Sequence, residues 1–189
     1  MNIVLNDEEL RMALRQYLAR LATPPQKIVE ELHVHHGQAI ADVVAIYNEA
    51  HCYEIKGDND NISRLKVQGK FYDKVFRKTT LVTTTKHRAN ALRTAPAHWG
   101  ILIIEFSNDK PKIKSLRGAS SSPCFDKEKA VQTLWRNEML ELISKYDLPV
   151  STKLNKRDLA TSIASSLSIP VISKDVAKLL TLRTSPIGC

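Results

Sequence analysis

An acid and a base stand two residues apart at the end of an apolar segment. Glu54 and Lys56 flank Ile55 in the stretch AHCYEIKG, whose other residues are typical of a buried strand. Side chains alternate along a strand, so Glu54 and Lys56 are expected on one face. Moving a charged group out of water costs free energy, so charged residues at the end of a buried strand indicate a functional site.

Asp42 is the third member of the predicted site. It lies in AIADVVAIYN, a second predicted strand, and a hairpin turning around residues 48–50 places Asp42 opposite Lys56 and diagonal to Glu54. A slip of one residue would separate the three side chains. Two carboxylates beside an ammonium group favour Mg²⁺ or Mn²⁺, which prefer oxygen ligands. We expect Asp42, Glu54 and the backbone carbonyl of Ile55 to bind the metal, with Lys56 assisting an attacking water.

Glu31 is a candidate fourth member. We predict a short helix over QKIVEELHV, and Glu31 borders the apolar face of that helix, so it could reach the hairpin as a catalytic group and metal ligand. Two simpler alternatives stand beside this hypothesis. Glu31 could be a solvated helix acid, and Glu54 and Lys56 could form an ordinary surface ion pair worth about 0–1 kcal/mol.

The order Glu31, Asp42, Glu54-Ile55-Lys56 resembles the motif of the PD-(D/E)XK nuclease superfamily. The following helix adds Gln68-x-x-x-Tyr72, which is similar to the Q-x-x-x-Y motif of RecB-type nucleases. More narrowly, segments from about residue 28 to about residue 142 resemble a family of small bacterial and phage proteins named from an "sce" locus tag.

The resemblance implies a restriction-endonuclease-like core, in which helices flank a small mixed β-sheet. It also implies an enzyme that hydrolyses phosphodiester bonds in DNA with Mg²⁺ or Mn²⁺. Asp42, Glu54, Lys56 and Glu31 would be its catalytic residues, and Gln68 and Tyr72 would bind the substrate. The alternative is a non-catalytic nucleic-acid-binding or protein-interaction module of the same fold, in a phage or defence context.

Positive charge is concentrated in the middle of the chain. Residues 62–117 hold 13 Lys and Arg against 3 Asp and Glu, within a net charge of +8. In the predicted helix NISRLKVQGKFYDKVFR, Lys66, Lys70 and Lys74 recur every four residues and therefore share a face. Such a row could follow a phosphate backbone, and a solvated outer face is the alternative. We therefore expect a nucleic-acid partner, DNA in preference to RNA.

The periodicities predict an α/β core with a helical C-terminal part. We place the core and its N-terminal helix at residues 1–118, and a helical extension packed on it at residues 119–189. The extension could also form a homodimer or bind a partner protein. Helices are expected over residues 6–21, 26–34, 61–77, 87–95, 126–146, 155–167 and 173–183, and strands over 39–48, 50–57, 79–85, 99–107 and 110–118.

The composition favours a cytoplasmic protein without membrane contact. The longest strongly apolar run, Trp99 to Phe106, is far shorter than the roughly 20 residues that span a bilayer. The first residues are acidic and amphipathic, unlike a signal peptide. Three cysteines form an odd set without motif spacing, which fits a reducing compartment.

Overall fold

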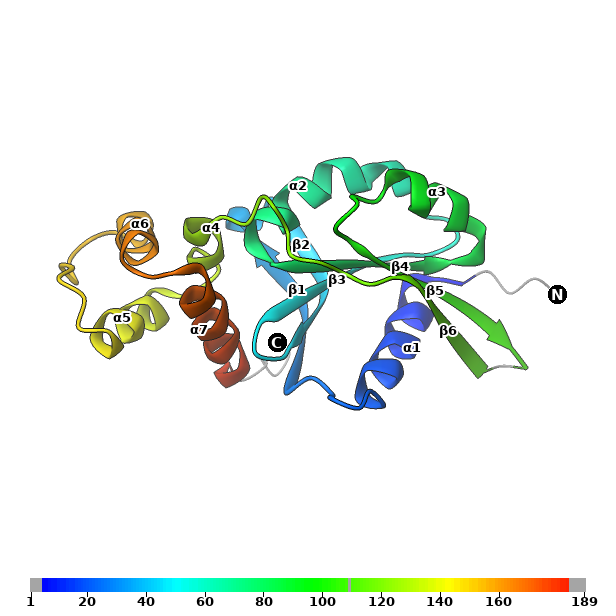
Figure 1. Ribbon diagram of the computed structural model, residues 1–189, viewed down its shortest axis with the longest axis horizontal. Coiled ribbons are helices and arrows are strands. Elements are labelled where there is room, and N and C mark those ends of the chain that lie inside the picture. Colours follow the sequence, from blue (N-terminus) through cyan, green and yellow to red (C-terminus); the bar gives the residue numbers. More distant parts are fainter. Residues whose placement is uncertain (1–4, 109, 184–189) are drawn as a thin grey trace.

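A six-stranded mixed β-sheet organises the computed structural model, which describes residues 5–108 and 110–183, apart from the side chain of His36 (Figure 1). The strands lie side by side in chain order. The pairs β1–β2, β2–β3 and β5–β6 are antiparallel, whereas β3–β4 and β4–β5 are parallel. The strands are β1 (Lys27–Val34), β2 (Ala39–Ile46), β3 (Ala50–Lys56), β4 (Lys78–Thr84), β5 (Gly100–Ser107) and β6 (Lys110–Arg117).

Helices cover both faces of this sheet (Figure 1). Helix α1 (Asp7–Ala19) packs on one face, while α2 (Leu65–Val75) and α3 (Arg88–Thr94) lie over the other. Three short 3₁₀ turns are η1 (His35–Gly37), η2 (Ile62–Arg64) and η3 (Thr85–His87). The remaining helices gather beyond one end of the sheet: α4 (Lys127–Val131), α5 (Arg136–Lys145), α6 (Lys156–Ser166) and α7 (Ile169–Leu182).

The predicted mixed α/β architecture, a sheet flanked by helices, is confirmed. Helix α1 begins where the sequence predicts, because Asn6 and Glu9 form a reciprocal capping box. Its apolar stripe of Leu10, Leu14 and Leu18 is fully buried against the sheet. Among the described helices, none is long and apolar enough to cross a membrane.

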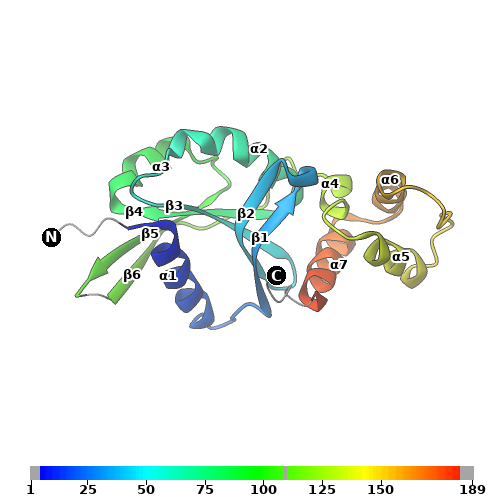
Figure 2. The same ribbon diagram turned by 180° about the vertical axis from the view of Figure 1, so that it is seen from behind.

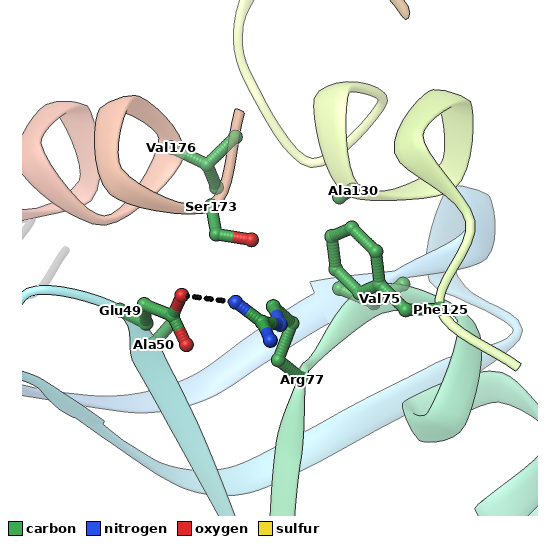
Figure 3. A pocket seen from close by; sticks show the side chains of 8 residues that line it. All are labelled: Glu49, Ala50, Val75, Arg77, Phe125, Ala130, Ser173 and Val176. Atoms are coloured by element: carbon green, nitrogen blue, oxygen red, sulfur yellow. Dashed lines mark hydrogen bonds and ion pairs between the residues drawn. The ribbon is translucent and has the colours of Figure 1, made fainter. Parts of the chain in front are cut away.

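The C-terminal helices share a hydrophobic core with the α2 face of the sheet. Where α4 and α7 meet the sheet, Arg77 and Glu49 form an ion pair at 2.6 Å, close to Ser173 of α7 (Figure 3). The cavity at this junction has a volume of about 10 Å³. Since that is room for at most one water molecule, this junction is a packing contact and leaves no space for a larger ligand.

Three predictions of local structure are wrong. Residues 26–34 form strand β1 instead of a helix, because so short an amphipathic segment fits both periods and pairing with β2 decides. The helix expected over residues 126–146 is two helices, α4 and α5, separated at residues 132–135. The last helix, expected from residue 173, already begins at Ile169, so Ser173 lies buried within α7.

Candidate functional site

Asp42 and Glu54 lie beside each other on the α2 face of the sheet. The β2–β3 register pairs Val43 with Tyr53, so its continuation sets Asp42 opposite Glu54. Our predicted register, with Asp42 opposite Lys56, is therefore wrong by two residues. A register shift of two residues keeps every side chain on the same face of the sheet, so Asp42 and Glu54 still lie on one face.

Short contacts hold this acid pair in place. The backbone N–H of Ile55 donates to Asp42 Oδ2 at 2.7 Å, and Lys56 Nζ donates to Glu54 Oε1 at 2.5 Å. From the opposite face of the sheet, Arg11 of α1 donates to the backbone carbonyl of Asp42 at 2.8 Å. One oxygen of each carboxylate is thus already engaged within the chain.

Burial makes the pair unusual. Glu54 is 0% exposed, and its Oε2 has no hydrogen-bond partner among the described residues. Burial, followed by the charge of Glu54, raises the pKa of Asp42 to about 7. Asp42 is therefore expected to change its protonation state near neutral pH.

Gln68 and Tyr72 belong to α2, the helix that covers this face of the sheet. Tyr72 is fully buried, and its hydroxyl donates to the backbone carbonyl of Ile40 at 2.7 Å. Burial, reinforced by the charge of Glu54, raises the pKa of Tyr72. Gln68 Oε1 is buried without a hydrogen-bond partner among the described residues. Substrate binding by these two residues stays a prediction.

Glu31 does not join the acid pair. It is exposed in the edge strand β1, its φ of 55° departs from regular strand geometry, and it lines a separate groove. Its predicted position on a helix above the hairpin is wrong, because that helix is a strand. Metal binding by the Ile55 carbonyl and by Glu31 stays a prediction. The position of Glu31, away from Asp42 and Glu54, gives it no support.

Helices α2 and α3 lie over one face of the sheet (Figure 1), and with the turns η2 and η3 they carry a set of exposed cations that we call the basic face. We define it by seven exposed cations: Arg64, Lys66, Lys70, Lys74, Lys86, Arg88 and Arg93. Within the described part of the chain, none of the seven forms an ion pair. The one acid between residues 62 and 94 is Asp73, which is buried and accepts hydrogen bonds from His98 and Trp99.

A large groove, not predicted from the sequence, runs between β1 and the C-terminal helices. Its volume is about 1070 Å³, slightly above the roughly 300–1,000 Å³ of small-molecule binding clefts. Trp135, Lys156 and Arg183 line its helical wall. No local pattern in the sequence identifies these residues as neighbours, because the groove forms where distant segments of the chain meet.

Comparison with known proteins identifies a different family from the one expected. The family model described as "Bacteriophage P4 protein cII" matches residues 2–185. "Protein cII" of Enterobacteria phage P4 is 24% identical over 174 residues, which cover 92% of this chain and 66%, just under two thirds, of that protein's length. No solved structure matches the chain.

These matches correct the nuclease hypothesis. The PD-(D/E)XK resemblance, the predicted Mg²⁺-dependent hydrolysis of DNA and the description as a metal-binding hydrolase are wrong, because the whole-chain match is to the cII family. Residues 5–108 and 110–183 also contain no group of three or more His, Cys, Asp or Glu that could hold a metal ion. Binding of Mg²⁺ or Mn²⁺ by Asp42 and Glu54 alone stays a prediction. The chain belongs to the bacteriophage P4 protein cII family.

Proposed function

We propose that this protein is a binding module for nucleic acid, with DNA as the expected ligand, and that the basic face is its contact surface. The observation that carries the proposal is the set of seven exposed cations on η2, α2, η3 and α3 without an ion-pair partner among the described residues. A surface with uncompensated charge of one sign attracts polyanions.

The geometry of α2 fits a phosphate backbone. Lys66, Lys70 and Lys74 follow one another at four-residue intervals, about 6 Å apart along the helix axis at 1.5 Å per residue. Side chains at this spacing stand on one face of the helix. Contacts of this kind fix the position of the ligand and carry no sequence information, so we expect weak dependence on base sequence.

The fold keeps this row facing solvent. The buried residues Leu65, Tyr72 and Val75 attach α2 to the sheet, which leaves the lysines on the outer side. The 3₁₀ turn η2 leads into α2 and is capped by Asn61, whose side chain accepts from the N–H of Ser63 at 2.9 Å. The lysine row is therefore presented by an anchored helix.

Salt-dependent binding tests the proposal. Fluorescence anisotropy with labelled DNA would compare the wild type with the triple variant Lys66→Gln/Lys70→Gln/Lys74→Gln. Each lost phosphate contact lowers the slope of log K against log salt by about 0.7 to 0.9. The triple variant should therefore lose roughly 2 to 3 units of slope, together with affinity at low salt.

The edge strand β6 offers a matched control. Lys110, Lys112 and Lys114 are also exposed, and Lys110→Gln/Lys112→Gln/Lys114→Gln removes the same charge outside the basic face. We expect this control to keep most of the affinity and slope. Equal losses in both triple variants would attribute binding to net charge alone, and no binding by the wild type at low salt would refute the proposed function.

A further inference from the structure

The groove beside β1 is built like a binding site for an unstacked base. One wall is the edge strand β1, which pairs only with β2 among the described strands. The other wall comes from residues 132–135 between α4 and α5, from Lys156 at the start of α6 and from Arg183 just after α7. Figure 2 shows β1 on the side of the sheet that faces these helices. Its volume of about 1070 Å³ is much larger than the small cavity at the Arg77–Glu49 junction. The groove therefore has room for a ligand that the junction cavity does not have.

Trp135 provides an aromatic surface in this groove. The residue is 53% exposed, although it is one of only two tryptophans and the other, Trp99, is fully buried. The guanidinium of Arg183 lies 4.4 Å from the centre of the Trp135 ring. Arg183 is itself fixed by two bonds to Glu138, at 2.7 Å and 2.6 Å. Arg183 thus covers one side of the indole, and about half of the residue stays exposed.

The charge of the groove favours an anionic occupant. Four cations and two acids line it: Arg15, Lys27, Lys156, Arg183, Glu30 and Glu31. Arg15 pairs with Glu30 at 3.3 Å, and Arg183 pairs with Glu138. Lys27 and Lys156 are then the groove cations without an ion pair among the described residues, against Glu31 as the acid without one. Lys156 forms no ion pair among the described residues, so its charge is available to a ligand.

One end of the groove lies beside α2. His35 lines this end, where its Nε2 is 3.2 Å from the backbone carbonyl of Phe71 and the two rings pack edge to face. Phe71 belongs to α2, the helix that carries the lysine row. A strand that leaves the groove at this end therefore meets the helix of the basic face.

We propose that this groove binds single-stranded DNA, with one base stacked on Trp135 and the backbone passing Lys156 toward the α2 lysines. The inference rests on the proposed function and names the form of nucleic acid that the protein takes. Bases in a duplex already stack on their neighbours, whereas an unpaired base can stack on an exposed aromatic side chain beside cations.

Intrinsic fluorescence gives a direct readout. Titration of the full chain with a short oligodeoxythymidylate should quench the Trp135 emission, and a duplex of the same length should not. Trp135→Ala should weaken binding of the single strand by roughly 5- to 150-fold, the range for one stacked base, while Trp135→Phe should restore most of it. Glu31→Gln should tighten binding, because it removes the acid in the groove for which no ion pair is seen among the described residues.

Leu182→Ala is the matched control, since Leu182 is exposed on α7 and does not line the groove. Equal quenching by duplex and single strand, or full affinity in Trp135→Ala, would overturn the inference. Quenching by an extended acidic peptide but not by the single strand would also overturn it and make the groove a peptide site.

The lysine variants separate this inference from the proposed function. If the α2 triple variant binds like the wild type while the single strand still quenches Trp135, the basic face is not the contact surface and the groove is. If the α2 variant loses binding but Trp135→Ala does not, the proposed function stands and the groove inference fails.

Discussion

The buried carboxylate pair makes the stability of this protein depend on pH in an unusual direction. Burial raises the pKa of Asp42 from 3.8 to about 7, so the folded chain holds this proton more tightly than the unfolded chain. The stabilising contribution is therefore complete below about pH 4 and is lost as the pH rises through 7. At 1.36 kcal/mol per pKa unit, the shift from 3.8 to about 7 corresponds to a loss of about 4 kcal/mol in the free energy of unfolding. This is an upper value, because part of the shift comes from the coupling between Asp42 and Glu54.

Asp42→Asn removes this titration with little change in shape. The asparagine oxygen can still accept from the Ile55 N–H, which lies 2.7 Å from Asp42 Oδ2 in the wild type. We expect the variant to be more stable than the wild type at pH 8, by up to about 4 kcal/mol. The two should be closest below about pH 4, where Asp42 is protonated in both the folded and the unfolded chain. Urea unfolding followed by circular dichroism at several pH values measures both quantities.

Glu141→Gln serves as the control, because Glu141 is an exposed acid on α5 without an ion pair among the described residues. Its stability should follow the wild-type pH profile. Parallel profiles for Asp42→Asn and the wild type would show that Asp42 is ionised in the folded protein throughout this range, and the reasoning about the buried pair would be refuted.

Two further substitutions test other buried polar contacts by urea unfolding. Arg183→Met leaves Glu138, which is 6% exposed, without the two bonds from its guanidinium partner, and should reduce the free energy of unfolding by about 3–5 kcal/mol. Recovery in Arg183→Met/Glu138→Leu would confirm that an unpaired charge is the cause, and unchanged stability in the single variant would contradict it. Trp99→Phe removes the indole N–H that donates to Asp73 at 2.7 Å and should cost about 1–3 kcal/mol. A variant as stable as the wild type would show that His98 alone satisfies Asp73.

The wrong predictions for the partner of Asp42 and for the position of Glu31 have a common physical origin. The face shared by Asp42 and Glu54 follows from the two-residue period of strands, which a register shift of two leaves intact. Which residue stands opposite Asp42 depends on the turn between β2 and β3, and residues 48–50 did not specify it. Glu31 was misplaced because its segment fits either a helix or a strand, and only pairing with β2 distinguishes them.

The nuclease hypothesis failed for a related reason. Its motif consists of a few polar residues at variable spacing, and such a pattern can occur in chains that are not nucleases. Fold and local pattern do not by themselves assign an activity. The match to the phage P4 protein cII family extends over residues 2–185, so it constrains far more of the chain than the motif does.

The sequence by itself determined the features that depend on neighbouring residues. The capping box of α1, the apolar strands β2 to β5 and the lysine row of α2 all follow from local hydrogen bonding and periodicity. Tertiary structure alone decided the identity of β1, the burial of Glu54 and the groove that contains Trp135, Lys156 and Arg183. These features depend on which distant segments meet, because strand pairing and removal from water are properties of the folded chain as a whole.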